Sequence, residues 1–207
     1  MTLTTTLARL RAAHTCEHGY AMLVNYLGDD WPQDQPIDLL LTLQSNGSSD
    51  TLWAFRAARE PEAPAILRLI ACDLVEFVLP IWSALLPSDD MPHSAVRTAR
   101  AFIYGGASAD DLSAVRKTVC ERLRDSPLPE WADDVLRAAK HLVCNDPHEL
   151  LKATWFARSA YGSLRSADHP SSLPFEIFDR LTVSILRHYL GPYWSAGESL
   201  SGRQPSS

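Results

Sequence analysis

Long hydrophobic runs are absent from this chain of 207 residues. No window reaches the ~18 consecutive apolar residues that a membrane-spanning helix needs. The first residues also lack the basic start and apolar core of a secretory signal. We therefore expect a cytoplasmic protein that has no membrane partner.

The alternation of apolar and polar residues that marks half-buried strands is missing as well. Apolar residues recur instead at helical spacing along most of the chain. Hydrophobic residues make up 46% and charged residues 21% of the chain, which is ordinary for a globular protein and excludes wholesale disorder. These features predict an all-α fold, a multi-helix bundle of about 8–9 helices. We expect a single domain over residues 1–194 and a disordered tail, rich in Ser, Gly and Pro, over residues 195–207.

Cysteine is scarce, with four residues at Cys16, Cys72, Cys120 and Cys144. They lie far apart and form no C-x-x-C pair. The spacing therefore indicates neither the disulfide framework of a small secreted domain nor a zinc site. We expect four buried free thiols that pack as small hydrophobic groups.

Basic residues are absent between Arg11 and Arg56. The acidic residues of this segment are Glu17, Asp29, Asp30, Asp34, Asp38 and Asp50. The segment carries the whole net charge of −6, because the other 19 of the 25 acidic residues balance the 19 basic ones. Such a surface is unsuited to nucleic acid, whose affinity for proteins comes from Lys and Arg. It favours a basic protein partner.

Turn residues divide the helical pattern into expected helices at residues 3–27, 36–43, 50–58, 63–86, 92–104, 109–123, 129–143, 145–164 and 174–190. Ser108 is suited to cap the helix that follows it, and Asp89 or Asp90 the helix entered at Pro92. Asp34 and Pro36 are expected to begin the second helix in the same way.

Two segments of the chain resemble each other. A shift of 56 residues places Cys16 on Cys72, Asp34 on Asp90 and Pro36 on Pro92. This spacing predicts two tandem three-helix repeats over residues 14–60 and 70–120. The C-terminal helices would then follow over residues 129–190.

The second of these segments carries the most recognisable motifs. They are Cys72-Asp73 on a helix that leads to Leu79-Pro80, then Asp89-Asp90-Met91-Pro92, Ala99-Arg100-Ala101-Phe102 and the turn Gly105-Gly106. Together they resemble a family of helical immunity proteins from bacterial polymorphic toxin systems. Met91 and His93 depart from the pattern at positions that are usually basic in the family. The resemblance implies an all-helical protein that neutralises a toxin domain, and it assigns no catalytic residues.

The resemblance and the acidic segment lead to one hypothesis. The protein binds and occludes a basic toxin domain through Asp29, Asp30, Trp31, Asp34 and Asp38, with Trp31 as an apolar anchor among the carboxylates. We expect no enzyme activity, no metal and no cofactor. A helical scaffold or adaptor without a toxin partner is the second hypothesis.

A third hypothesis is a metal-dependent hydrolase. His14, Glu17 and His18 form the pattern H-x-x-E-H, in which two histidines one helical turn apart hold zinc and the glutamate acts as a base. Enzymes with this pattern need a further acidic ligand from an α/β scaffold, and no sheet is expected here. We therefore favour a core or interface pair of histidines over a metal site.

Overall fold

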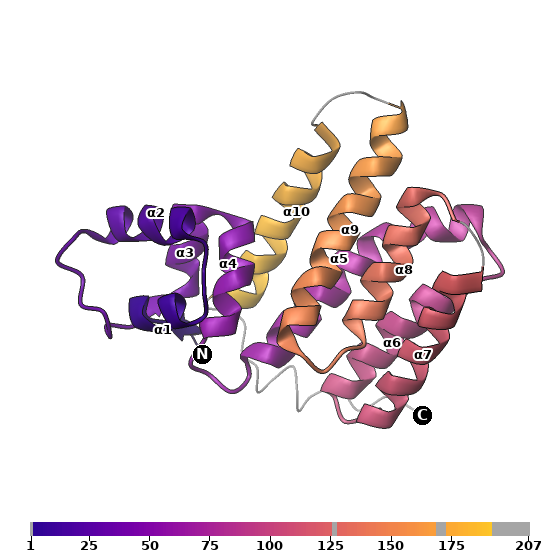
Figure 1. Ribbon diagram of the computed structural model, residues 1–207, viewed down its shortest axis with the longest axis horizontal. Helices are drawn as coiled ribbons and strands as arrows, with labels where there is room; N and C mark the ends of the chain where they lie inside the picture. Colours follow the sequence, from indigo (N-terminus) through magenta and orange to yellow (C-terminus); the bar gives the residue numbers. More distant parts are fainter. Residues whose placement is uncertain (1, 126–127, 169–172, 192–207) are drawn as a thin grey trace. The chain divides into compact units, whose positions relative to one another are not determined.

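The computed structural model describes residues 2–125, 128–168 and 173–191. Within these ranges the elements are β1 (Thr4–Thr5), α1 (Leu7–Ala12), α2 (Glu17–Leu27), β2 (Ile37–Asp38), α3 (Leu39–Asn46), α4 (Ser48–Ala54), the 3₁₀ turn η1 (Phe55–Ala57), α5 (Ala63–Leu85), α6 (Met91–Ile103), α7 (Ala109–Asp125), α8 (Glu130–Leu142), α9 (Pro147–Asp168) and α10 (Leu173–Leu190). The all-α, multi-helix prediction is confirmed (Figure 1). The expected tail at residues 195–207 lies outside the described residues. None of the described helices is long and apolar enough to cross a membrane.

The chain divides into two compact units. Unit 1 contains residues 1–67 and 182–207, and unit 2 contains residues 68–181. The boundary therefore falls within α5 and again within α10. The single domain and the tandem repeat of the sequence analysis both stay predictions.

The expected helix over residues 3–27 is wrong, because the structure divides it into β1, α1 and α2. His14 lies between the helices with a φ of 53°, in the left-handed region. The chain restarts at Cys16, whose Sγ accepts a hydrogen bond from the Gly19 N–H at 3.2 Å and so caps α2. The break contains neither Gly nor Pro, and apolar residues keep their helical spacing across it. The sequence therefore predicts one continuous helix here.

A short antiparallel strand pair corrects the expectation that strands are absent. Thr4 pairs with Asp38, and Thr5 pairs with Ile37. A strand of two residues is too short to show alternation in the sequence. Ile37 and Leu39 are both fully buried, so this pair brings the N-terminal segment onto the core of unit 1.

Because of the strand pair, the following helix begins later than the sequence predicts. α3 begins at Leu39 and not at Pro36, because the Asp38 carboxylate caps it by accepting a hydrogen bond from the Leu40 N–H at 2.8 Å. Asp34 therefore does not cap this helix, and that prediction is wrong. α4 begins next to Gly47 without a side-chain cap.

Unit 2 follows the expected helices closely. α5 contains Pro80 in its interior, and its buried face includes Ile70, Leu74, Val78 and Trp82. The predicted Ser108 cap of α7 is confirmed, whereas Asp90, the N-cap residue of α6, forms no capping hydrogen bond through its side chain. Asp89 accepts a hydrogen bond from the Met91 N–H at 3.1 Å. Ser108 and Asp111 exchange hydrogen bonds at the start of α7, in the manner of a capping box.

α8 and α9 form an antiparallel helical hairpin in unit 2 (Figure 1). The side of α8 that packs inward carries small and medium residues. Those buried are Ala132, Val135, Leu136, Ala138, Ala139 and Leu142. Small side chains let the two helices approach closely, and α9 contributes the buried Ala153 and Ala157 to the same interior.

All four cysteines are free thiols. Cys72 and Cys144 are buried as expected, but Cys120 is half-buried and Cys16 is exposed. Cys16 differs because it lies at a helix N-terminus and not within a packed helix. Burial raises the pKa of the Cys72 thiol to about 12, so this residue remains protonated.

Candidate protein-binding surface

The predicted binding residues lie mainly in the loop between α2 and β2, residues 28–36. Gly28 ends α2 with a φ of 91°, a left-handed conformation that favours glycine. The Trp31 N–H then donates to the Gly28 carbonyl at 3.1 Å and forms a turn. The Gln33 carbonyl accepts a hydrogen bond from the Ala8 N–H at 3.0 Å and fastens the loop to α1. Figure 1 shows the loop as the indigo trace beyond the C-terminal end of α2.

Three carboxylates of this loop face solvent. Asp29, Asp30 and Asp34 are exposed. Within the described part of the chain, none of them forms a hydrogen bond or ion pair through its carboxylate. Their charges are therefore available to a partner.

Trp31 is half-buried among these acids, so only part of its ring is open to a partner. Its indole Nε1 is buried and has no hydrogen-bond partner among the described residues. Because this nitrogen is enclosed, Trp31 presents part of its ring, and not its N–H, at the surface.

Two other acids of the segment have structural roles. Asp38 is half-buried and caps α3, as described above. Asp50 accepts a hydrogen bond at 2.8 Å from the Asn46 side chain, which also donates to the Gly19 carbonyl. The free negative charge thus lies on the loop and on Glu17, which is exposed in the first turn of α2.

Two exposed apolar side chains on α2 lead into the loop. Met22 is 39% and Tyr26 is 53% exposed. They are four residues apart and so lie on the same face of the helix. Sequence reasoning missed them, although their spacing on an expected helix could have indicated a shared face. We call Met22, Tyr26, Asp29, Asp30, Trp31 and Asp34 the α2–loop surface.

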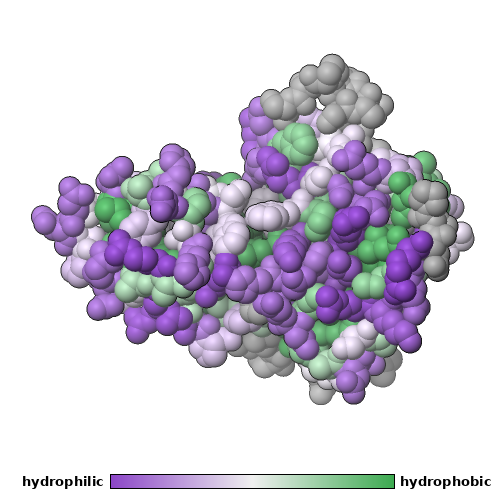
Figure 2. All heavy atoms as spheres, in the orientation of Figure 1, coloured by the Kyte–Doolittle hydropathy of each residue, from purple (hydrophilic) through white to green (hydrophobic). Residues whose placement is uncertain are grey.

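Hydrophilic side chains cover most of the visible face of the part of the molecule that contains α1–α4, with smaller hydrophobic patches between them (Figure 2). Exposed Tyr side chains next to charged groups are typical of protein interfaces, because the ring supplies contact area at low entropic cost. The α2–loop surface thus combines exposed apolar side chains with three exposed carboxylates.

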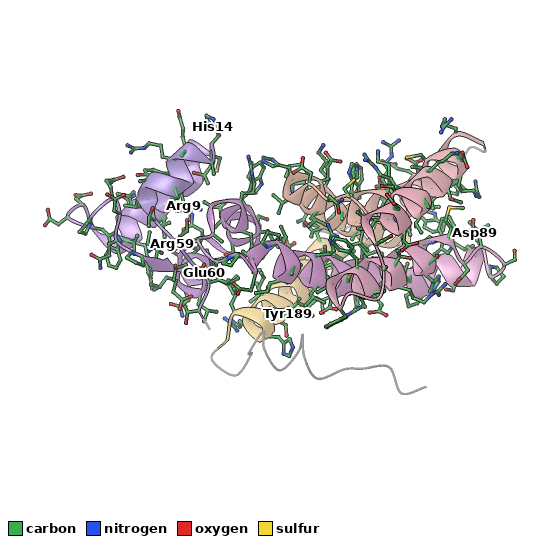
Figure 3. The ribbon with its side chains drawn as sticks, turned by 90° about the horizontal axis from the view of Figure 1, so that it is seen from below. Arg9, His14, Arg59, Glu60, Asp89 and Tyr189 are labelled. Carbon is green, nitrogen blue, oxygen red and sulfur yellow. The ribbon has the colours of Figure 1, made fainter. Side chains whose placement is uncertain are left out.

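The H-x-x-E-H residues do not share a helix. His14 lies in the turn after α1, whereas Glu17 and His18 are in the first turn of α2. All three are exposed, so His14 and His18 are not buried in a core, and the interface pair stays a prediction (Figure 3 labels His14). Among the described residues, the group of side chains close enough to hold a metal is His141, Cys144 and Glu149, which includes none of the three.

The Asp89-Asp90 motif borders a shallow groove in unit 2 of about 440 Å³. The groove is lined by Ser88, Asp89, Asp90, Met91, Ser94, Val115 and Thr118. Both carboxylates are already paired: Asp89 with Arg122 at 3.2 Å and Asp90 with Arg97 at 2.5 Å.

Arg97 thus pairs with the turn before its own helix. Arg100 pairs with Asp73 and Glu76 of the neighbouring helix α5.

Comparison with known proteins gives no further assignment. No family model, no curated protein and no solved structure matches this chain. The resemblance to helical immunity proteins consequently rests on the motifs around Cys72, Asp89-Asp90 and Gly105-Gly106.

Proposed function

We propose that this protein binds and occludes a basic bacterial toxin domain through the α2–loop surface. In this proposal it acts in the cytoplasm, as a binding protein and not as an enzyme. The family resemblance supplies the class of partner. The charge and exposure of the α2–loop surface supply the place of contact.

One observation carries this proposal: three exposed carboxylates without partners lie in a segment that has no basic residue between Arg11 and Arg56. Complementary charge accelerates the encounter of two proteins and helps to select the partner. Because exposed charges are screened beyond about 8 Å at physiological ionic strength, the association should slow as salt is added.

The apolar residues of the surface would supply the close contact. Tyr26 is the most exposed aromatic of α2, and the half-buried Trp31 lies between the exposed Asp30 and Asp34 in the sequence. Aromatic side chains are enriched among the residues that dominate binding energy. A basic partner that packed on this surface would cover the Tyr26 ring and the open part of the Trp31 ring.

A growth-protection experiment tests this proposal. A toxin domain encoded by the gene next to this protein's own gene is expressed in bacteria together with the wild-type protein or a variant. The triple variant Asp29→Asn, Asp30→Asn and Asp34→Asn should fail to protect the cells. The charge-matched control Asp110→Asn, Glu121→Gln and Glu130→Gln removes three exposed acids of unit 2 and should protect like the wild type.

Circular dichroism checks that both triple variants are folded. A loss of protection can then be attributed to the surface and not to unfolding. Equal protection by the two triple variants would contradict the role of the loop. Failure of the wild-type protein to protect against the neighbouring toxin would support the scaffold hypothesis instead.

A further inference from the structure

Three side chains with metal-binding atoms meet where α8 passes into α9. One donor atom from each of His141, Cys144 and Glu149 lies within 4.8 Å of the other two. His141 Nδ1 lies 2.5 Å from Glu149 Oε2. The cluster is well enclosed, because His141 is 6% and Cys144 is 3% exposed, and the Glu149 side chain is 22% exposed.

The hairpin between the helices builds this cluster. Cys144 follows the end of α8, and Asp146 caps α9 by accepting a hydrogen bond from the His148 N–H at 2.8 Å. This turn brings Glu149 back against His141, eight residues earlier in the chain. The His141 ring also stacks on Phe156, with ring centroids 5.4 Å apart and nearly parallel planes.

Arg68 fixes the position of the cysteine from outside the hairpin. Its guanidinium is buried and donates to the Cys144 carbonyl at 2.5 Å. The same guanidinium lies over the Phe102 ring at 4.8 Å. The backbone of the cluster is thus held by contacts that do not use its donor atoms.

We propose that His141, Cys144 and Glu149 form a binding site for a zinc-like divalent transition-metal ion. Imidazole nitrogen, thiolate sulfur and carboxylate oxygen are the three ligand types that zinc takes in proteins. A sulfur ligand disfavours calcium and magnesium, which take oxygen ligands. At ligand distances of about 2.0–2.3 Å, small side-chain shifts would bring the three donor atoms around one ion.

Burial and neighbouring charges shift the pKa values of His141 and Glu149. Burial and the charge of Lys140 lower the pKa of His141, although the adjacent Glu149 carboxylate opposes this shift. The hydrogen bond from Lys152 holds the pKa of Glu149 below its usual range. Lys152 contacts Oε1 of Glu149, whereas His141 faces Oε2.

The cysteine would change its state on binding. Burial raises the pKa of the Cys144 thiol, despite the nearby charges of Arg116, Lys140 and Arg68. Binding of a divalent cation would therefore release the thiol proton to the buffer. The thiolate, the Glu149 carboxylate and the divalent ion would together carry no net charge, which limits the cost of burying them.

The same facts argue against a nucleophilic cysteine. A reactive thiol needs a lowered pKa and access to a substrate. Cys144 has a raised pKa and is almost completely buried.

Titration of the purified, metal-free protein with Co²⁺ tests this proposal. Cobalt bound to a thiolate shows a charge-transfer absorption in the near ultraviolet, which should saturate at one Co²⁺ per chain and disappear when Zn²⁺ is added. Cys144→Ser should abolish this absorption. His141→Gln and Glu149→Gln should weaken binding at least about tenfold, since even outer contacts of metal sites are worth about 10- to 100-fold.

Matched controls use neighbouring groups outside the cluster. Cys120→Ser and His148→Ala should bind Co²⁺ like the wild type, because neither residue belongs to the cluster. Zn²⁺ should raise the melting temperature of the wild type but not that of Cys144→Ser. An absent charge-transfer band in the wild type would overturn the proposal. So would a band that survives Cys144→Ser or depends on the exposed Cys16.

Discussion

Glu60 accepts two hydrogen bonds from Thr4, one from the backbone N–H to Oε2 at 2.8 Å and one from the hydroxyl to Oε1 at 2.7 Å. The Thr4 carbonyl in turn accepts a hydrogen bond from the Arg59 N–H at 2.9 Å. Arg9 completes the contact by donating to the carbonyls of Ala57 and Ala58. Figure 3 shows Arg9, Arg59 and Glu60 in the same region of unit 1. This network joins the N-terminal strand to the segment before α5.

The contact predicts a pH-dependent stability. Burial raises the pKa of Glu60, but the hydrogen bonds from Thr4 outweigh it, and the pKa lies below the usual value of 4.5. The stabilisation by ionised Glu60 is thus present above about pH 4.5 and is lost as the pH falls through the lower pKa of the folded state. Because Glu60 is partly exposed, we expect Glu60→Gln to cost about 1 kcal/mol at neutral pH.

Urea unfolding of the wild type and Glu60→Gln at several pH values measures this effect. The difference in unfolding free energy should shrink as the solution becomes more acidic. Thr4→Val, which removes the hydroxyl but keeps the N–H, should give a smaller loss at neutral pH. A difference that stays constant with pH would show that the Glu60 carboxylate does not stabilise unit 1 through its charge.

Gly162 and Phe175 make a close contact between α9 and α10. A Cβ at position 162 would overlap the Phe175 ring. Gly162→Ala should therefore lower the unfolding free energy by about 1–3 kcal/mol, as overpacking does in other proteins. Gly106→Ala is the matched control, because its Cβ would meet the Ala101 carbonyl oxygen at an ordinary 3.6 Å. Similar melting temperatures for the two variants would contradict the described packing.

The four thiols should react with a thiol-specific reagent at distinct rates. Cys16 is exposed and should react first, and the half-buried Cys120 should react more slowly. Cys72 and Cys144 should react only after unfolding, since both are buried and burial raises the pKa of each. Cys16→Ser should remove the fastest phase in the native protein. A fast phase that persists in this variant would contradict the exposure of Cys16.

The part of the fold from Ala63 onward could be predicted because its helix ends carry strong signals. Gly105 and Gly106 end α6, Ser108 caps α7, and Pro129 precedes α8. These are local effects of backbone conformation and hydrogen bonding, so they can be recognised in a single sequence.

The N-terminal part depends on contacts between distant residues. The break at His14 to Cys16 has no Gly or Pro. β1 forms by pairing with the distant β2, and Thr4 also contacts Glu60, which is 56 residues away. Asp38 rather than Asp34 caps α3, because the strand pair positions Ile37 first. Tertiary structure overrides local preference at these positions.

The two candidate sites also differ in how far they can be predicted from local sequence. The acidic loop could be found because its carboxylates are close in sequence and lie next to the turn residues Gly28 and Pro32. The cluster of His141, Cys144 and Glu149 was missed, because its spacing spans a turn between two helices and matches no short motif. Its members become neighbours only when α9 folds back on α8.

The affinity of the α2–loop surface for the neighbouring toxin domain is the most direct test of the central claim. Dissociation constants are measured by titration calorimetry at low and high salt, for the wild type, the Asp29/Asp30/Asp34→Asn variant and the Asp110/Glu121/Glu130 control. We predict that the loop variant binds at least about tenfold more weakly and loses most of the salt dependence, while the control resembles the wild type. Equal affinity and equal salt dependence for the loop variant and the wild type would contradict the account.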